Sequence, residues 1–151
     1  MTDAECMRLA LDWAVKDPDE VPVGAVIIRD RTLISSAHNQ RERPGGALQH
    51  AEMLAIARAQ EALGTNRLEG CTMYVTLEPC PMCAGALILA RLSRLVFAAF
   101  DSQYGCCGSR YALPLDPAFH HRVKCEGGLL AGESEALLRG FFARHRDRGL
   151  I

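Results

Sequence analysis

The 151-residue chain is 49% hydrophobic and 23% charged, with a formal net charge of −1. This size suits one domain with a sizeable core, so we expect residues 1–151 to form a single domain. No apolar run approaches the roughly 20 residues of a membrane span, and the first residues lack a signal-peptide pattern, so we expect a cytoplasmic protein with no membrane partner. The small net charge excludes a global electrostatic argument for nucleic-acid binding, which must then rest on local patches.

The first predicted element is a helix that begins with a capping box. Thr2 and Glu5 have the required spacing, and we expect the helix to continue to about Lys16 and to end because of Pro18. One face of this helix carries its apolar residues, Met7, Ala10, Leu11 and Ala14.

A hairpin and a second helix are predicted next. The segment VPVGAVIIRDRTLISSAH contains two β-rich runs around Asp30 and Arg31, and the polar loop NQRERPGGALQ follows it. Residues 49–64 then show a helical period of about 3.6. The apolar positions of that period are Met53, Ile56, Ala57 and Leu63.

The second half of the chain alternates strands and helices. The segments CTMYVT, RLVFAAF and RVKCEG are predicted strands, and helices are expected at about residues 82–90 and 133–146. Residues 101–121 are rich in Gly and Pro and are predicted to be irregular. This alternation indicates a layered α/β domain.

The start of the second helix carries an unusual pair, His50 and Glu52. A two-residue spacing turns the side chains about 200° apart, so they cannot share one side face of a helix. Both can converge on a point beyond the helix N-terminus, where a metal ion would explain them. The alternative is that they are ordinary first-turn residues, with the Glu complementing the helix dipole.

A second chemical motif lies in TLEPCPMCAGALILA, where Cys80 and Cys83 have a spacing that places both sulfurs in the first turn of a helix. Seven cysteines, an odd number, favour metal ligands and free thiols over a disulfide framework. A redox C-x-x-C pair is the alternative, but it leaves His50 and Glu52 unexplained. Zn²⁺ prefers thiolate and imidazole ligands, and three of them with an open fourth position mark a catalytic site.

A structural zinc site with a fourth cysteine ligand is another interpretation. The candidates for that ligand are Cys6, Cys71, Cys106, Cys107 and Cys125. None of them repeats the paired spacing, so we expect them to be buried or loop residues. Ordinary roles are likewise expected for the remaining histidines, His38, His120, His121 and His145.

Together, HAE and PCPMC match the H-x-E…P-C-x-x-C signature of zinc deaminases of bases and nucleosides. Along nearly its whole length the chain resembles the tRNA adenosine deaminases, which convert the wobble adenosine (position 34) of an anticodon loop to inosine. The similar segments include EVPVGAVI, HAEMLAI, YVTLEPCPMCAGAL, RLVFAAFD, GCCGS, HRVKCEGGLLAGE and FFARHR. Gln49 departs from the resemblance, because many relatives have a small residue before the histidine.

The resemblance implies a cytidine deaminase-like three-layer α/β/α sandwich with a mixed five-stranded sheet, assembled as a homodimer. It implies one Zn²⁺ per subunit, held by His50, Cys80 and Cys83. Glu52 would carry protons in a hydrolytic deamination that releases ammonia. The implied partner is a tRNA anticodon stem-loop.

The resemblance also implies residues that contact the base. Asn39 and the Ala51 backbone amide would hydrogen-bond it, while Val23, Gly24 and the Pro79 carbonyl would line the pocket. Three of these have structural alternatives: a turn role for Asn39, a core role for Val23, and backbone geometry for Gly24.

Expectations for RNA contacts rest on the C-terminal segment and one loop. Four arginines between residues 139 and 148 alternate with Phe141 and Phe142, a mixture that suits single-stranded RNA. We expect Phe142, Arg144 and Arg146 to contribute to substrate binding, with the phenylalanines largely buried and some of the arginines touching RNA. An amphipathic helix with a solvated basic face is the alternative. Asp101, after a predicted strand, is expected to contact RNA or to serve a surface turn.

Two other functions remain open from the sequence. A deaminase of a free base or nucleoside, such as cytosine, guanine or a cytidine-like compound, would share all the zinc chemistry. A zinc-containing binding protein without catalysis would not require Glu52. Release of ammonia distinguishes the enzymes from the binding protein.

Overall fold

A mixed sheet of five strands forms the centre of the structure, a computed structural model that describes residues 1–146. The order of its strands is β2-β1-β3-β4-β5, with β1 antiparallel to both neighbours and β4 parallel to both of its own. The strands are β1 (Gly24–Arg29), β2 (Thr32–His38), β3 (Thr72–Leu77), β4 (Arg94–Ala99) and β5 (Lys124–Gly127).

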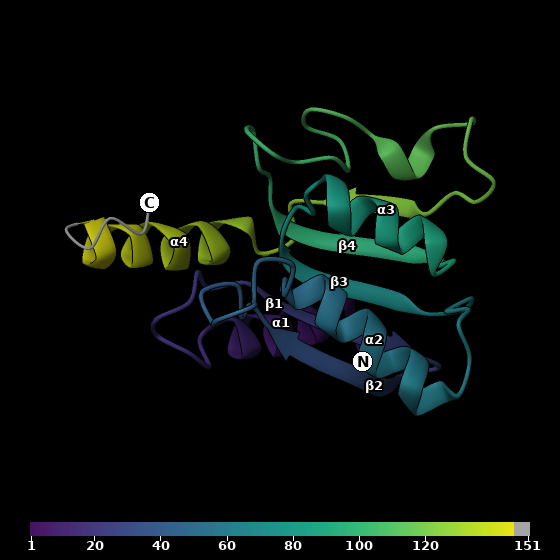
Figure 1. Ribbon diagram of the computed structural model, residues 1–151, viewed down its shortest axis with the longest axis horizontal. Helices are drawn as coiled ribbons and strands as arrows, with labels where there is room; N and C mark the ends of the chain where they lie inside the picture. Colours follow the sequence, from purple (N-terminus) through teal and green to yellow (C-terminus); the bar gives the residue numbers. More distant parts are fainter. Residues whose placement is uncertain (147–151) are drawn as a thin grey trace.

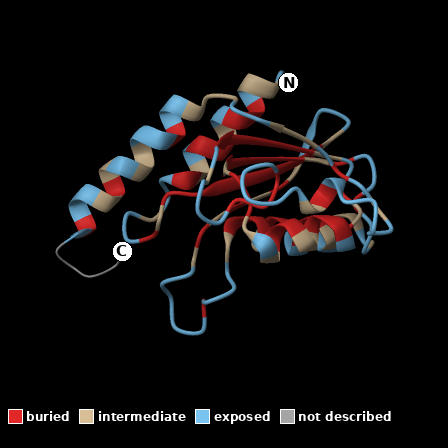
Figure 2. Cartoon of the chain, turned by 90° about the horizontal axis from the view of Figure 1, so that it is seen from above, coloured by how far each residue is buried: buried red, intermediate tan, exposed pale blue. Residues whose placement is uncertain are grey.

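Helices cover both faces of this sheet (Figure 1). They are α1 (Asp3–Ala14), α2 (Ala51–Leu63), α3 (Pro81–Leu89), the short 3₁₀ helix η1 (Leu113–Leu115) and α4 (Ala131–His145). The cluster of buried residues under α2 and α3 is separate from the cluster under α1 and α4, and Figure 2 shows the buried sheet between these helices. This arrangement confirms the predicted three-layer α/β/α sandwich with a mixed sheet.

The predicted hairpin is confirmed, and its turn lies at the expected residues. Asp30 and Arg31 have φ angles of 50° and 65°, the left-handed conformation that a two-residue turn of type I′ requires. The pairing of β1 with β2 shifts register between Ile27 and Ile28.

The capping box of α1 is also confirmed. The Thr2 side chain accepts a hydrogen bond from the Glu5 backbone, and the Glu5 side chain accepts one from the Thr2 backbone. The predicted apolar face is buried. The helix ends at Ala14, two residues before the predicted end at about Lys16, because Val15, with ψ near 13°, leaves the helix before Pro18 is reached.

The predicted face of α2 is wrong in part. Ala55 and Ala59 are fully buried and Ile56 is 7% exposed, whereas Ala57 is exposed. Alanines on the buried side let the helix lie close to the sheet, and their weak hydrophobicity hides that side from a periodicity count.

The remaining elements match their predicted positions closely. The helix expected at residues 82–90 begins one residue earlier, at Pro81, and the C-terminal helix begins at Ala131. Residues 101–121 are irregular apart from η1 and a single β-bridge. Within residues 1–146, no helix has the length and apolar character needed to cross a membrane.

Candidate active site

Two helix N-termini bring three metal-ligating side chains together. His50 is the N-cap of α2, Cys80 is the N-cap of α3, and Cys83 lies in the first turn of α3. The Nδ1 atom of His50 is 3.6 Å from the Sγ atom of Cys80 and 3.6 Å from that of Cys83. The structure therefore confirms that the two motifs converge.

The distances between these atoms fit a tetrahedral zinc site. Bonds of about 2.3 Å to sulfur and about 2.0–2.1 Å to nitrogen, at a tetrahedral angle, separate the two ligand atoms by about 3.6 Å. Among residues 1–146, the group of closely spaced potential ligands consists of His50, Cys80 and Cys83, with no fourth His, Cys, Asp or Glu. A site closed by a fourth cysteine does not form in this part of the chain, and the three ligands suit an open catalytic zinc.

Electrostatics in the cluster favour a thiolate at Cys80. The pKa of Cys80 is lowered to about 4, first by a hydrogen bond from the Cys83 thiol and also by one from His50, against the opposing effect of burial. Donation to Cys80 raises the pKa of Cys83, and the same thiolate raises the pKa of His50. These shifts favour one thiolate in the cluster, at Cys80, and Zn²⁺ binding would displace the proton of Cys83.

Glu52 lies beside the cluster without belonging to it. Its side chain is in the first turn of α2 and only 4% exposed. Burial raises the pKa of this carboxyl group to about 7. A group with such a pKa can both accept and donate a proton near neutral pH, as a general acid–base catalyst requires.

A cavity of about 470 Å³ opens onto the cluster and Glu52, a volume within the range of small-molecule and cofactor sites. Its walls come from the segment just before β1, the end of β3, the loops that follow β2 and β4, and the N-termini of α2 and α3. The lining residues are Val21, Val23, Asn39, Arg41, His50, Glu52, Leu77, Glu78, Cys80, Asp101 and Tyr104.

Asn39 is placed as a polar group inside this cavity. The residue is 7% exposed, and its backbone N–H donates to the Val23 carbonyl at 3.0 Å, which fixes it at the end of β2. Its side-chain amide makes no hydrogen bond within the part of the chain that the structure describes. Asn39 can therefore offer both a donor and an acceptor to a ligand.

Three predicted pocket residues are not among those that line the cavity. A Cβ atom on Gly24 would lie 2.0 Å from the Ala10 carbonyl oxygen, so this glycine permits close packing of β1 against α1. Ala51 is fully buried, and the Pro79 carbonyl accepts a hydrogen bond from the Cys106 backbone at 2.9 Å. The structure therefore supports the alternative given for Gly24, in which the residue is a glycine because the backbone packs closely there.

Glu78 is a cavity residue that the sequence analysis missed. The residue is 2% exposed, and its carboxylate accepts hydrogen bonds from the backbone N–H groups of Asp101, Cys107 and Ser109. These bonds tie the loop after β4 to the end of β3. The sequence signal for Glu78 is its position next to the PCPMC motif, but this position does not reveal which backbone groups the carboxylate binds.

The structure confirms the turn expected at Asp101, whereas its contact with RNA stays a prediction. Its Oδ1 atom accepts hydrogen bonds from the backbones of Gln103 and Tyr104, which forms a turn, and the residue also lines the cavity. Arg41 and Tyr104 line the cavity as well and were missed, because their loops carry no regular pattern.

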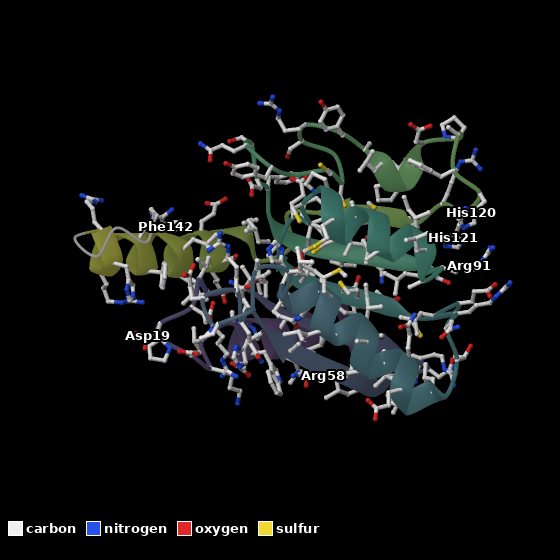
Figure 3. All side chains as sticks on the ribbon, viewed as in Figure 1. Asp19, Arg58, Arg91, His120, His121 and Phe142 are labelled. Atoms are coloured by element: carbon white, nitrogen blue, oxygen red, sulfur yellow. The ribbon has the colours of Figure 1, made fainter. Side chains whose placement is uncertain are left out.

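The RNA-facing residues expected near the C-terminus lie on α4, which extends past the sheet on the side where α2 and α3 begin (Figure 1). Phe141 is buried and Phe142 is half-buried, with its place on α4 shown in Figure 3. Arg144 and Arg146 are exposed, and Arg144 lines a shallow hollow beside Pro18 and Glu20. The fourth arginine of that segment, Arg148, lies outside the described residues.

The remaining histidines have the ordinary roles expected for them. His38 stacks on Trp13, and His145 stacks on Phe141. His121 contacts the Leu92 carbonyl oxygen, and it lies with His120 near Arg91, away from the first turns of α2 and α3 (Figure 3).

Comparison with known proteins identifies the family. Residues 1–99 match the model of the cytidine and deoxycytidylate deaminase zinc-binding region. The chain belongs to this zinc-binding deaminase family. Within the family it is 46% identical to the tRNA-specific adenosine deaminase of Bacillus subtilis, across 94% of this chain and 89% of that protein. It is also 46% identical to the tRNA-specific adenosine deaminase of Aquifex aeolicus, across 93% and 94% of the two chains.

Solved structures of deaminases share the fold. A structure from a study of A-to-I editing by tRNA:A34 deaminases superposes with a TM-score of 0.84 at 40% identity, covering 89% of this chain and 99% of that one. A guanine deaminase from Nitrosomonas europaea gives a TM-score of 0.79 at 26% identity, covering 94% and 85%. Membership in the family, together with the ligand cluster, makes Zn²⁺ the cofactor of this deaminase domain.

Proposed function

We propose that this protein is a zinc-dependent hydrolase that deaminates adenosine to inosine at the wobble position of a tRNA anticodon loop. The observation that carries the substrate assignment is the 46% identity to two tRNA-specific adenosine deaminases over nearly the whole chain. The reaction class is supported by the cluster of His50, Cys80 and Cys83 beside the buried Glu52.

In this proposal His50, Cys80 and Cys83 hold the zinc ion. When bound, Zn²⁺ supplies the Lewis-acid chemistry that makes water nucleophilic near neutral pH. Glu52 accepts one proton from the attacking water and delivers it to the ring nitrogen of adenine, and it then carries the second water proton, from the newly formed hydroxyl group, to the departing amino group. Adenosine and water thus give inosine and ammonia, with Glu52 returned to its starting state.

The cavity residues orient and enclose the base. The free side-chain amide of Asn39 hydrogen-bonds it, and Val23 contributes an apolar wall. We also propose that the Ala51 backbone N–H, next to His50, and the Pro79 carbonyl, next to Cys80, hydrogen-bond the base, while Gly24 acts through the packing of β1. Exclusion of water by Val21, Val23 and Leu77 strengthens these polar contacts.

The direct test is to incubate the purified zinc-loaded protein with total tRNA and to sequence the anticodons, where inosine is read as guanosine. We expect a change of A to G confined to position 34. Unchanged anticodons combined with ammonia release from a free base would overturn the tRNA assignment and leave the zinc chemistry standing.

Deamination of free guanine is the second candidate, and the specific observation in its favour is the superposition with a guanine deaminase. The lower identity, 26% against 46%, ranks it second. Measuring ammonia from guanine, cytosine, cytidine and adenosine in parallel separates the two functions.

We further propose that residues 1–151 form one deaminase domain, that two copies assemble as a homodimer, and that the protein works in the cytoplasm. Large exposed apolar side chains support self-association. They include Leu89 at 76%, Leu115 at 49% and Phe119 at 41% exposure. Sedimentation at several protein concentrations tests the dimer, and fractionation of cells tests the location.

A further inference from the structure

We propose that Tyr104 is a substrate-binding residue that stacks on the base next to the target adenosine and so contributes to selection of a looped RNA over a free nucleoside. This inference rests on the proposed function. It adds a contact outside the zinc signature and outside the basic segment of α4.

The first observation is the placement of the Tyr104 ring. Tyr104 lines the same cavity as His50 and Glu52, yet the residue is 65% exposed. An aromatic side chain that borders a cavity and faces solvent lies at the mouth, outside the position that a reacting base would take. The side chain makes no hydrogen bond or ring contact with another residue in the described range 1–146, so its π-face is available.

The second observation is that the backbone carrying this ring is held firmly. The Tyr104 N–H donates to the Asp101 Oδ1 atom at 3.1 Å, and the Asp101 N–H donates to the buried Glu78 carboxylate at 3.0 Å. A Cβ atom on Gly105 would lie 2.4 Å from the Glu78 carboxyl carbon, so the loop wraps closely around that group. Because the backbone at Tyr104 is already ordered, stacking of a base on the ring has only the side-chain rotamer left to order.

The third observation is the charge near the ring. Arg41, from the loop after β2, lines the same cavity with its side chain 56% exposed, and its guanidinium also pairs with the neighbouring Glu42 at 3.0 Å. A cation and an aromatic ring at one mouth suit a single strand, because each nucleotide brings both a phosphate and a stacking face. A free base would use the interior of the cavity and would leave Tyr104 without a partner.

The test compares Tyr104→Ala with Tyr104→Phe on an anticodon stem-loop carrying adenosine at the wobble position. In Tyr104→Ala, loss of stacking should lower kcat/KM for the stem-loop roughly 5- to 150-fold, mostly through KM. Tyr104→Phe keeps the ring and should have the kcat/KM of wild type. The matched control is Tyr111→Ala, because Tyr111 lies in the same irregular region with 64% exposure and does not line the cavity. Zinc content should be equal in all variants.

A coupling experiment separates stacking from a structural effect. Stem-loops with an abasic residue directly 5′ or directly 3′ of the target are assayed with wild-type protein and Tyr104→Ala. On one of these two substrates the penalty of the Ala substitution should disappear, which identifies the stacked base. If Tyr104→Ala lowers kcat/KM equally on the intact stem-loop and on both abasic stem-loops, or lowers it on none of them, the role of Tyr104 is overturned. A wild-type protein inactive on every stem-loop overturns the proposed function instead.

Discussion

The Nδ1 atom of His50 lies 3.6 Å from the Sγ atom of Cys80, although 30 residues separate them in the chain. Each is the N-cap of its own helix, and within the described chain neither side chain caps that helix. Both side chains instead point to one place beyond the two helix ends. The positive ends of two helix dipoles thereby favour thiolate there. This end-on geometry explains how His50 and Glu52 can serve the same site.

Glu52 is expected to be required for catalysis and dispensable for the metal. Glu52→Ala should lower turnover by about 10²- to 10⁴-fold, the usual contribution of a positioned acid–base group, and should retain zinc because it removes no ligand. Metal analysis and an ammonia assay on the stem-loop measure both effects. Glu61→Ala, on the exposed side of α2, is the matched control. Substantial turnover by Glu52→Ala would exclude this residue as the essential proton carrier.

Cys80→Ser and Cys83→Ser should each lower zinc occupancy and the Tm. An uncharged hydroxyl is a poor zinc ligand, and metal binding stabilises the folded state to which it is coupled. Cys125→Ser is the control, because this half-buried thiol lies outside the ligand cluster. Full zinc occupancy in both variants would show that the ligand assignment is wrong.

The sequence predicts the metal ligands and the proton carrier of this site better than it predicts the residues that line the cavity. The ligands and Glu52 belong to two short motifs whose spacing is set by helix first turns, so local geometry is enough to find them. The partners of Glu78 are contributed by Asp101, Cys107 and Ser109, which approach it only after β3 and β4 have paired.

The same distinction holds for the fold. The hairpin at Asp30 and Arg31 and the capping box of α1 depend on neighbours in sequence, and both are confirmed. The buried side of α2 depends on how closely the helix approaches the sheet, and there the exposed Ala57 is wrongly placed inside. Alanine suits either environment, so periodicity alone cannot assign it.

Glu78→Gln is expected to loosen the loop that follows β4. The amide has one acceptor oxygen, so its NH₂ group would face backbone N–H donors, and unmade bonds of this kind destabilise a protein by about 1–3 kcal/mol. Urea unfolding should show this loss, and KM for the stem-loop should rise because Tyr104 and Asp101 lie on that loop. Glu69→Gln, at an exposed position before β3, should change neither. An unaltered stability of Glu78→Gln would mean that the loop is held by other contacts.

Asp3 should contribute to stability in a pH-dependent way. Hydrogen bonds, first from Arg94 and then from Tyr74, lower the pKa of Asp3 from 3.8 to about 2. A lowered folded-state pKa means that the contribution is present above the unfolded value near 3.8 and is lost as the pH falls through about 2. Urea unfolding of wild type and Asp3→Asn should therefore differ at pH 6 and converge between pH 4 and about 2. Asp12→Asn, on the exposed side of α1, should follow wild type throughout, and a gap that persists at low pH would contradict this role for Asp3.

The basic end of α4 is expected to contribute to RNA affinity without affecting the zinc site. Arg144→Glu combined with Arg146→Glu should weaken stem-loop binding, and the slope of log affinity against log salt should flatten by about 0.7 for each lost phosphate contact. Arg67→Glu combined with Arg91→Glu makes the same change of charge beyond the C-terminal ends of α2 and α3, about 20 Å along α2 from its first turn. This control should bind the stem-loop like wild type, with zinc content unchanged in both.

The same proteins distinguish the contribution of the RNA from that of the base. Free adenosine should be a poor substrate for wild type, because binding energy from flanking nucleotides positions the reacting base and is missing in the truncated substrate. The arginine reversals should therefore lower kcat/KM for the stem-loop toward the value for free adenosine, and they should leave the free nucleoside rate unchanged. Equal losses on both substrates would place the effect of Arg144 and Arg146 in the fold of α4, where Phe141 packs, and the basic surface would then have no specific role in RNA binding.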